Sequence, residues 1–323
     1  MKRSEIRRIS VEECADILLG IEHPLILCHI RPDGDTVGTA VALAKIYKAL
    51  GKKAEIACAH PIPERLAFIL DGIEVTGDVD GRCCVAVDVA SPSQLGALYE
   101  RDIEIACAID HHQSSTPYAP HLTMGEASSA GEVLYDILAL LEERGLIKLT
   151  EEIARPLYAS ISSDTGCFAY SNAREKTHIV ASKLIGTGIN SADINHCLFH
   201  SKSREQIMAE SFTGSKISLA EGGRVAYSCI TIANLDSLGL SIEHFEAAID
   251  IIRSVRGVEV AIYAKEVAPG EYKFSLRSTG VPVSHIAEHF GGGGHLRAAG
   301  FSVKTEDIES TIKEVLYLTS RLF

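Results

Sequence analysis

The chain has 323 residues, 46% of them hydrophobic, and a formal net charge of −12. At roughly 100–200 residues per domain, this length is enough for two domains with buried cores. Long nucleic acid is usually bound by clusters of Lys and Arg. The acidic charge and the lack of a long basic run therefore argue against a channel for long strands, and any phosphate must be held by metals or by a few local cations.

The sequence shows no sign of a membrane span or of export. No apolar run reaches the ~18 residues that a spanning helix needs, and the polar start lacks the apolar core of a signal peptide. The nine cysteines contain no CxxC pair, so they fit small buried residues of a reducing compartment better than a zinc site. We expect a cytoplasmic protein without a membrane partner.

The first half alternates short apolar runs with stretches of helical spacing. Nearly unbroken apolar strands are typical of a parallel sheet that is covered on both faces. We therefore predict an α/β fold whose N-terminal domain has a parallel sheet with helices on both faces. The predicted strands are 24–28, 54–59, 83–87 and 103–109. The predicted helices are 36–50, 127–144, 151–162 and 177–185.

The pattern loosens from about residue 186 and then resumes. Predicted strands follow at 224–230, 258–266 and 271–277, with a helix near 241–249. These elements indicate a second, smaller α/β domain. The predicted bounds are 1–190 for the first domain, 191–211 for a linker and 212–323 for the second domain.

Polar side chains occur where the strands and one helix of the first half should end. In open α/β sheets ligands bind beyond the carboxyl ends of the strands, so these side chains should meet at one edge. They are His29, Asp33 and Asp35 after the first strand, Asp88 after the third, Asp110, His111 and His112 after the fourth, and Asp164 at the end of a helix.

Carboxylates and imidazoles together indicate a site for two divalent cations. This ligand set suits Mn²⁺, and Mg²⁺ or other divalent ions less specifically. Two ions ~3.5–4 Å apart need a bridging ligand and several carboxylates. We expect Gly34 to allow a tight loop that aims Asp33 and Asp35 inward, with Pro32 stiffening its entry.

Each group has a simpler interpretation when it is taken alone. Asp88 fits a loop cap, the segment from Asp33 to Asp35 fits an ordinary turn, and His29 fits a buried core histidine. The pair His111 and His112 after an aspartate is harder to explain in this way. The coincidence of all the groups at predicted strand or helix ends favours the metal site.

Several motifs resemble those of the DHH family of phosphoesterases. HIRPDGD (29–35) resembles the first motif, Val87 with Asp88 the second, Asp110-His111-His112 the motif that names the family, and SSDTGCF (162–168) the fourth. The second half resembles the DHH-associated domain, whose glycine-rich signature is similar to GGGGHLRAAG (291–300). The resemblance spans nearly the whole chain and is strongest to the nanoRNase and pAp-phosphatase branch.

The resemblance assigns a role to each position. It implies that His29 and Asp33 bind one metal, that Asp35, His111 and Asp164 bind the other, and that Asp88 bridges them. His112 would then face the substrate, and Asp110 would orient the neighbouring histidines. Thr39 stands where the family often has Ser, and both carry a hydroxyl.

The second domain is expected to hold the substrate. Its expected contacts are Arg277, Ser278, Gly292, Gly293, Gly294, His295 and Arg297. Glycines allow a phosphate to approach the backbone amides closely. Without the resemblance, the glycine run would read as a flexible loop and Arg277 as a solvated surface residue. The extra glycine in GGGGH blurs which glycine contacts the ligand.

The resemblance implies hydrolysis of short RNA, of about two to five nucleotides, to mononucleotides, or removal of phosphate from pAp. We expect two divalent metal ions as cofactors, Mn²⁺ first, with Mg²⁺ or Co²⁺ as alternatives. A cyclic di-AMP or pApA phosphodiesterase, an inorganic pyrophosphatase and a non-catalytic nucleotide-binding protein are the competing interpretations. The sequence leaves a homodimer open.

Overall fold

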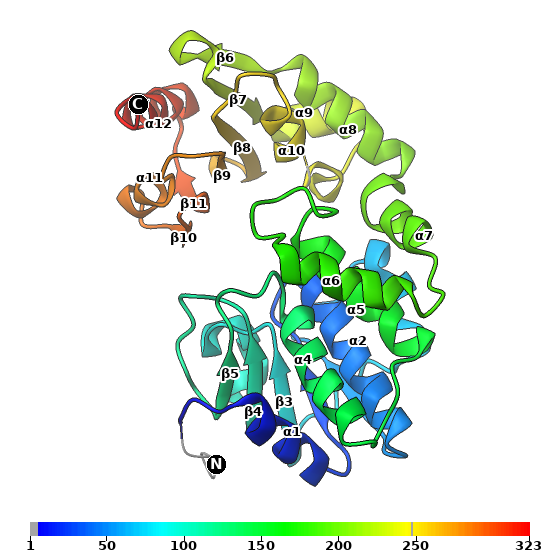
Figure 1. Cartoon of the computed structure of the whole chain (residues 1–323). Coiled ribbons are helices and arrows are strands. Elements are labelled where there is room, and N and C mark those ends of the chain that lie inside the picture. Colours follow the sequence, from blue (N-terminus) through cyan, green and yellow to red (C-terminus); the bar gives the residue numbers. More distant parts are fainter. Residues whose placement is uncertain (1–5, 247) are drawn as a thin grey trace. The chain divides into compact units, whose positions relative to one another are not determined.

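The computed structural model describes residues 6–246 and 248–323. The chain divides into two compact units, and the division falls between Ser201 and Lys202 (Figure 1). This point lies within the predicted linker 191–211, although most of that segment is helical: α7 spans Ser191–Asn195, a π-helical turn spans His196–His200, and α8 spans Arg204–Ser215. The predicted outer bounds of the linker stay predictions.

The first unit contains a five-stranded sheet in the order β2-β1-β3-β4-β5, and every pair in it is parallel. The predicted parallel sheet is therefore confirmed, with β5 as an additional edge strand. The strands are β1 Leu25–Leu27, β2 Glu55–Ala57, β3 Arg82–Val87, β4 Ile103–Asp110 and β5 His121–Thr123.

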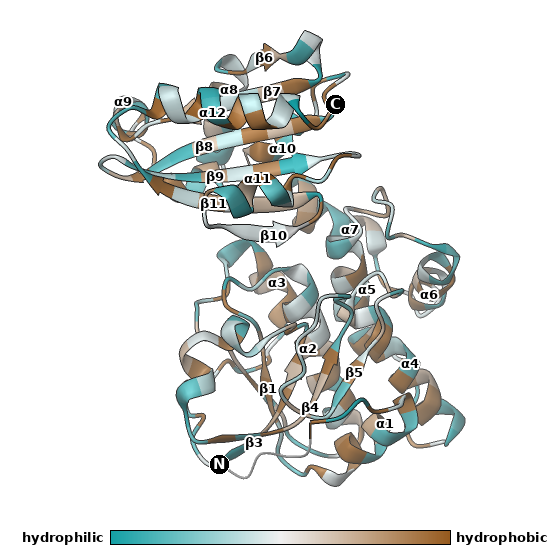
Figure 2. Ribbon diagram, turned by 90° about the vertical axis from the view of Figure 1, so that its left-hand side faces the viewer, coloured by the Kyte–Doolittle hydropathy of each residue, from teal (hydrophilic) through white to brown (hydrophobic). Residues whose placement is uncertain are grey.

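Both faces of this sheet are covered, because successive side chains along a strand point to opposite faces. Ile26 and Val85 pack into a core beneath the α-helices, whereas Leu25 and Cys84 pack on the other face against η2, a 3-10 helical segment. Figure 2 shows the apolar character of β1 in brown. The helical elements are α1 Val11–Gly20, α2 Gly34–Ala49, η1 Glu64–Leu66, α3 Ala67–Leu70, η2 Pro92–Glu100, α4 Ala130–Glu143, α5 Glu151–Asp164 and α6 Glu175–Ile185.

Two glycines of α2 allow α5 to approach closely. A Cβ at Gly38 would lie 2.6 Å from the Pro156 carbonyl oxygen, and one at Gly34 would overlap the Ser163 hydroxyl. Gly34 is the first residue of α2 rather than part of a tight loop. The loop explanation for Gly34 was therefore wrong, and the reason for a glycine there is the close contact with α5.

The second unit contains a six-stranded mixed sheet in the order β10-β11-β9-β8-β7-β6. The pair β7 with β8 is parallel, and the other pairs are antiparallel. The strands are β6 Ser218–Ala220, β7 Val225–Ile230, β8 Val260–Ala268, β9 Glu271–Ser278, β10 Gly293–His295 and β11 Ala298–Lys304. The smaller α/β unit is thus confirmed, with more strands than we predicted.

Helices lie on both faces of the second sheet (Figure 1). Ile262 and Phe274 belong to a core with residues of α11 and α12, and Ala261 and Tyr263 belong to a core with residues of α8, α9 and α10. A continuous helix near 241–249 was a wrong prediction, since a short 3-10 helix and a separate α-helix occur there. These elements are η4 Glu221–Gly223, α9 Ile232–Leu238, η5 Ile242–Phe245, α10 Ile249–Arg253, α11 Ser284–His289 and α12 Ile308–Ser320.

Within the described ranges, no helix combines the length and the apolar character that crossing a bilayer requires.

Candidate metal centre

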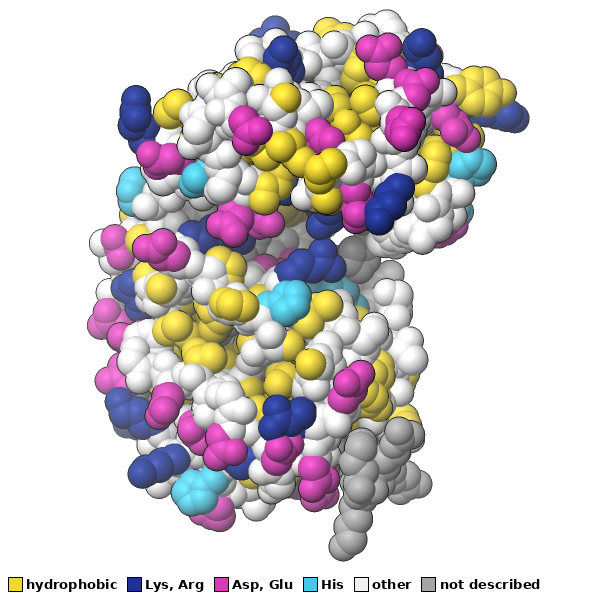
Figure 3. Space-filling model, turned by 180° about the vertical axis from the view of Figure 1, so that it is seen from behind, with side chains coloured by type: hydrophobic (Ala, Val, Ile, Leu, Met, Phe, Trp, Pro, Cys, Tyr) yellow, Lys and Arg dark blue, Asp and Glu magenta, His cyan; other side chains and the backbone are white. Residues whose placement is uncertain are grey.

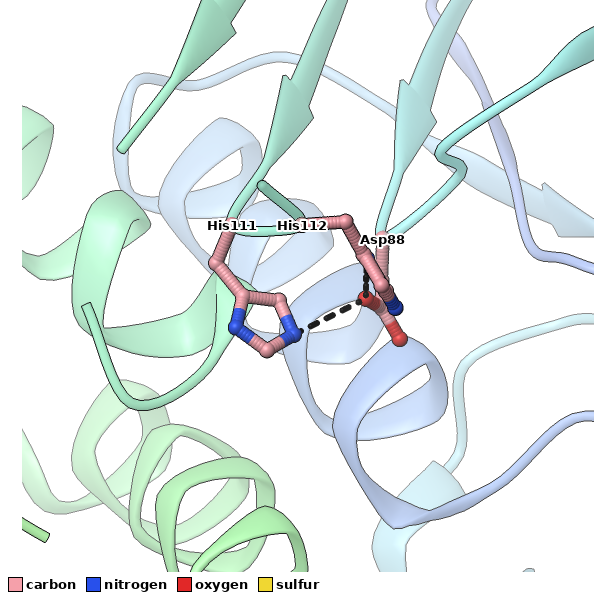
Figure 4. Close-up of side chains that lie close together, drawn as sticks. All are labelled: Asp88, His111 and His112. Atoms are coloured by element: carbon pink, nitrogen blue, oxygen red, sulfur yellow. Dashed lines mark ion pairs between the residues drawn. The ribbon is translucent and has the colours of Figure 1, made fainter. Parts of the chain in front are cut away.

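The predicted metal ligands of the first unit come together at the carboxyl edge of the parallel sheet. His29 follows β1, Asp88 follows β3, and His111 follows β4, so three neighbouring strands each deliver one side chain. Figure 4 shows Asp88 and the paired histidines converging from the ends of β3 and β4. Asp33 caps α2, Asp35 lies in its first turn, and Asp164 is the last residue of α5.

Asp88 lies at the middle of this cluster. Its Oδ2 is 3.4 Å from Nε2 of His29, and its Oδ1 is 3.5 Å from Nε2 of His111. The residue is only 3% exposed, and Oδ1 has no hydrogen-bond partner among the described residues. Its backbone has φ of +58°, a left-handed conformation that costs free energy outside glycine. The fold therefore places a strained, buried carboxylate with Oδ2 toward His29 and Oδ1 toward His111 and His112.

One group of candidate ligands consists of His29, Asp33 and Asp88, whose ligand atoms all lie within 4.8 Å of one another. Nε2 of His29 is 3.5 Å from Oδ1 of Asp33. The opposite ring nitrogen, Nδ1, donates a hydrogen bond to the Ile30 carbonyl at 2.7 Å. In the neutral ring this bond leaves the lone pair of Nε2 facing the two carboxylates.

A second group consists of Asp35, His111 and Asp164, within the same limit. Nε2 of His111 lies 3.6 Å from Oδ2 of Asp35 and 3.8 Å from Oδ2 of Asp164. Its Nδ1 faces the Ala127 carbonyl at 3.4 Å. This ring too therefore turns the lone pair of Nε2 toward carboxylate oxygens.

Asp35 is 1% exposed and is held by four donors. Its Oδ1 accepts from the hydroxyls of Thr39 at 3.0 Å and Ser160 at 2.6 Å, and from the Gly131 amide at 3.3 Å. Its Oδ2 accepts from the Ala130 amide at 2.8 Å. The Thr39 hydroxyl thus orients the Asp35 carboxylate, and the Ser of the related motif would donate the same hydrogen bond.

His112 forms a third group of candidate ligands with Asp88 and His111, and its Nδ1 lies 3.5 Å from Oδ1 of Asp88 (Figure 4). Its Nδ1 donates to Oδ1 of the buried Asp110 at 2.8 Å, which fixes the ring. Among the described hydrogen bonds, Asp110 contacts His112, and its expected role toward both histidines stays a prediction. The His112 ring also borders a pocket of about 480 Å³ within the first unit, which Arg8 and His121 help to line.

The charges in this cluster shift the pKa values of its members. Burial alone would lower the pKa of His29, but the carboxylates of Asp33 and Asp88 raise it to about 11. The pKa of His111 is likewise raised to about 10 against the effect of burial, mainly by Asp88 and Asp35. Burial, with the charge of Asp88 added, raises the pKa of Asp164 to about 6. The cluster therefore attracts positive charge.

These observations fit divalent cations. Asp88 belongs to the first ligand group and its Oδ1 lies 3.5 Å from His111 of the second, and lone pairs face one another across 3.4–3.8 Å. Such an arrangement is stable only with a proton or a cation between the ligands. The unpartnered Oδ1 of Asp88 fits a bridging ligand. The residues present are thus suited to a pair of divalent metal ions.

The predicted substrate residues of the second unit lie near one end of its sheet. Arg277 pairs in register with Ala298, and the Ser278 amide donates to the Arg297 carbonyl at 2.9 Å. The hydroxyl of Ser278 donates to the Val281 carbonyl. The glycine run forms the edge strand β10, where Gly293 pairs with Gly300. His295 lies in this strand, but its side chain is outside the described residues.

The glycine run is more ordered than a flexible loop. A Cβ at Gly292 would overlap the Gly300 carbonyl oxygen, and one at Gly294, which has φ of +143°, would lie 2.6 Å from Cα of Ala299. A Cβ at Gly293 would meet nothing within 4 Å. Two of the three predicted glycines are thus required by the turn into β11, and Gly293 is the one with open space beside it.

Comparison with known proteins agrees with these motifs. The DHH family N-terminal domain matches residues 24–161, and the DHHA1 domain matches residues 222–320. A "bifunctional oligoribonuclease and PAP phosphatase NrnA" of Thermus thermophilus is 32% identical over 311 residues, which cover 94% of this chain and 91% of that protein. The chain belongs to the DHH family.

A further relative and a solved structure are also similar to this chain. An NrnA protein of Bacillus subtilis with the same description is 26% identical over 281 residues, which cover 86% of this chain and 88% of that protein. A crystal structure of an exopolyphosphatase-related protein from Bacteroides fragilis has a TM-score of 0.88 and 19% identity, and covers 97% of this chain and 96% of that one. At this identity the structural likeness concerns the fold.

Sequence reasoning missed several residues that position the DHH ligands. Ser160, Glu132 and Asn172 contact the metal-ligand cluster or its supporting loop through hydrogen bonds. Only one pattern offered a signal, because Ser160 lies four residues before Asp164 on α5 and therefore shares its helix face.

Proposed function

We propose that the protein is a hydrolase that uses two divalent metal ions, preferably Mn²⁺, to cleave phosphoesters of short oligoribonucleotides and to remove phosphate from pAp. The observation that carries this proposal is the position of Asp88. One of its oxygens faces His29 and the other faces His111, so a single carboxylate serves both ligand groups. Mn²⁺ is preferred because the ligands mix imidazole with carboxylate.

The relatives support the choice of substrate. Two of them are described as oligoribonuclease and PAP phosphatase, and they match this chain across both units. The match to the Thermus thermophilus protein covers 94% of this chain and so spans all six proposed metal ligands and the glycine-rich strand. We therefore infer the same pair of activities, with mononucleotides as the products.

The reaction proposed is hydrolysis of a P–O ester bond. Divalent ions, when bound, supply positive charge for the phosphoryl oxygens and lower the pKa of water. A water oxygen forms the new bond to phosphorus, the bond to the leaving nucleoside oxygen breaks, and that oxygen takes up a proton. His29, Asp33 and Asp88 would hold one ion, Asp35, His111 and Asp164 the other, with Asp88 shared.

His112 is proposed to contact the substrate rather than an ion. Its Nδ1 is engaged by Asp110, and its ring borders the pocket that Arg8 and His121 help to line. Asp110 holds the ring in one orientation, so an oxygen of the scissile phosphate or leaving group would meet a fixed imidazole. The pocket offers space for the part of the substrate that leaves.

Within the second unit, the proposed substrate contacts are the residues at one end of the mixed sheet, namely Arg277, Ser278, Gly292, Gly293, Gly294, His295 and Arg297.

Short substrates are favoured because the surface has no continuous basic track on the face that Figure 3 shows, where Lys and Arg lie among Asp and Glu in both units. The sequence also contains no Trp for an extended stacking platform. The cytoplasmic location and the homodimer stay predictions.

A substrate panel tests the proposal. The purified protein is assayed with Mn²⁺, Mg²⁺ or Co²⁺ on a five-nucleotide RNA, pApA, pAp, cyclic di-AMP and pyrophosphate. We expect Mn²⁺-dependent release of mononucleotides from the RNA and of phosphate from pAp. Preferential cleavage of cyclic di-AMP would favour the alternative phosphodiesterase function. Release of phosphate from pyrophosphate alone, or no metal-dependent hydrolysis, would contradict the proposal.

A further inference from the structure

The segment 127–131, which leads into α4, supports two ligands of the second metal group. The Ala130 amide donates to Oδ2 of Asp35 at 2.8 Å, and the Ala127 carbonyl faces Nδ1 of His111 at 3.4 Å. Both ligands therefore take part of their orientation from the backbone of one short segment. A shift of this segment would move them together.

Asn172 links this segment to the third ligand of the same group. Its Nδ2 lies 3.0 Å from the Ser128 carbonyl, 3.1 Å from the Asp164 carbonyl and 3.3 Å from Oδ2 of Asp164. Two N–H groups thus serve three oxygens. The oxygen of the same amide, Oδ1, is buried without a partner among the described residues. Because an unpartnered buried oxygen is unfavourable, its presence indicates that the donors of Asn172 fix the amide.

Glu132 fixes the segment from the other side. This buried carboxylate accepts at Oε2 from the hydroxyl of Ser128 at 2.6 Å and from that of Thr177 at 2.8 Å. Ser128 is therefore held through its side chain by Glu132 and through its carbonyl by Asn172. The result is a chain of hydrogen bonds that ends on Asp164.

The first metal group is supported by other contacts. His29 donates to the Ile30 carbonyl, Asp33 accepts from the amides of α2, and the Asp88 amide donates to the Ile109 carbonyl. Among the described contacts, none of these involves Asn172 or the segment 127–131. The side chains of the two groups are thus held by different partners, and the groups are linked through Asp88 and through the Asp35 amide, which donates to Asp33.

We propose that Asn172 is a positioning residue that sets the affinity of the second metal, the one held by Asp35, His111 and Asp164. This inference rests on the proposed two-metal function. Loss of the Asn172 amide releases Asp164 and loosens the segment that carries the other two contacts. The second ion then binds more weakly, while the first keeps its ligands.

The test compares Mn²⁺ binding by wild-type protein with that of Asn172→Ala. Electron paramagnetic resonance reports whether two bound Mn²⁺ ions are magnetically coupled. In the wild type we expect two ions per chain and a coupled spectrum. In Asn172→Ala we expect the first ion to bind as before and the second to bind about 10–100-fold more weakly, with an uncoupled spectrum at limiting metal. Hydrolysis should recover as Mn²⁺ is raised.

The matched control is Asn190→Ala, an exposed asparagine of the same unit that caps α7. It should bind both ions as the wild type does. Glu132→Gln, which keeps the shape of the side chain, should weaken the second ion in the same direction by a smaller factor. This variant keeps the test decisive if Asn172→Ala does not fold.

The outcomes separate this inference from the proposed function. Two tightly bound, coupled ions in folded Asn172→Ala, or in Glu132→Gln if Asn172→Ala does not fold, would overturn the positioning role. Equal weakening of both ions would also overturn it, since the selectivity for the second group would be lost. Failure of the wild type to bind a coupled pair would instead overturn the two-metal function itself.

Discussion

The two sheets of the molecule present polar side chains in opposite ways. In the first unit all strands are parallel, so their carboxyl ends share one edge, and residues as distant as His29 and His111 meet there around the buried Asp88. In the second unit most pairs are antiparallel, and the candidate residues lie at a hairpin end where Arg297 is exposed. In the proposed function the first arrangement holds the metal ions, and the second contacts the substrate. Substitutions in the metal-ligand cluster of the first unit should therefore reduce kcat, and substitutions at the hairpin of the second unit should raise KM.

The largest effect is expected from Asp88→Ala. Removal of the shared carboxylate leaves both ligand groups incomplete, and metal catalysis supplies several kcal/mol, so kcat should fall by at least about 1,000-fold. The measurement is steady-state hydrolysis of a dinucleotide with saturating Mn²⁺, with thermal unfolding as a check on the fold. The exposed Asp236→Ala serves as the control. Activity within tenfold of the wild type would show that Asp88 does not join two ions.

The second effect concerns Arg277→Ala. A charged hydrogen bond to a phosphate contributes about 1.5–3 kcal/mol, so KM for pAp should rise by about 10–100-fold while kcat changes less. Lys273→Ala is the matched control, because Lys273 is an exposed cation on the same strand β9. An equal rise in KM for both variants would indicate a general charge effect rather than a specific contact.

The third prediction concerns pH. In the metal-free protein the pKa values of His29 and His111, about 11 and about 10, keep both rings protonated near neutral pH. A metal ion must displace these protons, so Mn²⁺ affinity should rise with pH, by about tenfold per pH unit for each proton released. Calorimetric titration at pH 6, 7 and 8, in buffers that differ in ionisation enthalpy, measures the Mn²⁺ affinity and the number of protons released. An affinity that is flat across this range would contradict the prediction.

The smallest effect is expected in the hairpin of the second unit. Gly292→Ala places a Cβ against the Gly300 carbonyl, so the free energy of unfolding should fall by about 1–3 kcal/mol. Gly293→Ala meets open space and should leave stability unchanged, although it narrows the approach to the backbone. Thermal unfolding measures the packing role of Gly292, and KM for pAp measures the role of Gly293 in substrate approach. Equal destabilisation by both variants would contradict the assignment.

The sequence was most informative where local pattern and topology agree. Apolar runs that end in charged residues predicted β1, β3 and β4 and the meeting of His29, Asp88 and His111, because parallel strands share a carboxyl edge. It was least informative in the second unit, where β10 and β11 are rich in glycine and alanine and have little strand propensity. The pairing of β10 with β11 depends on close contact between their backbones, which a local sequence pattern does not predict.

The supporting residues could not be predicted for a related reason. Asn172 and Ser128 are 44 positions apart, and Ser160 and Asp35 are 125 apart. Hydrogen bonds of this kind depend on how loops and helices pack in three dimensions and leave no periodic signal in the sequence. The left-handed backbone of Asp88 is similar, because a loop aspartate gives no sign of strain until its neighbours are placed.

The hydrogen bonds to Asp35 also determine how this carboxylate can coordinate an ion. Three donors, from Thr39, Ser160 and Gly131, occupy Oδ1, whereas Oδ2 accepts only from the Ala130 amide and is the oxygen more open to a metal. Asp35 would therefore hold an ion through one oxygen. Calcium favours larger shells of six to eight oxygens and often takes both oxygens of one carboxylate. We therefore expect these hydrogen bonds to Asp35 to weaken calcium binding relative to that of smaller divalent ions.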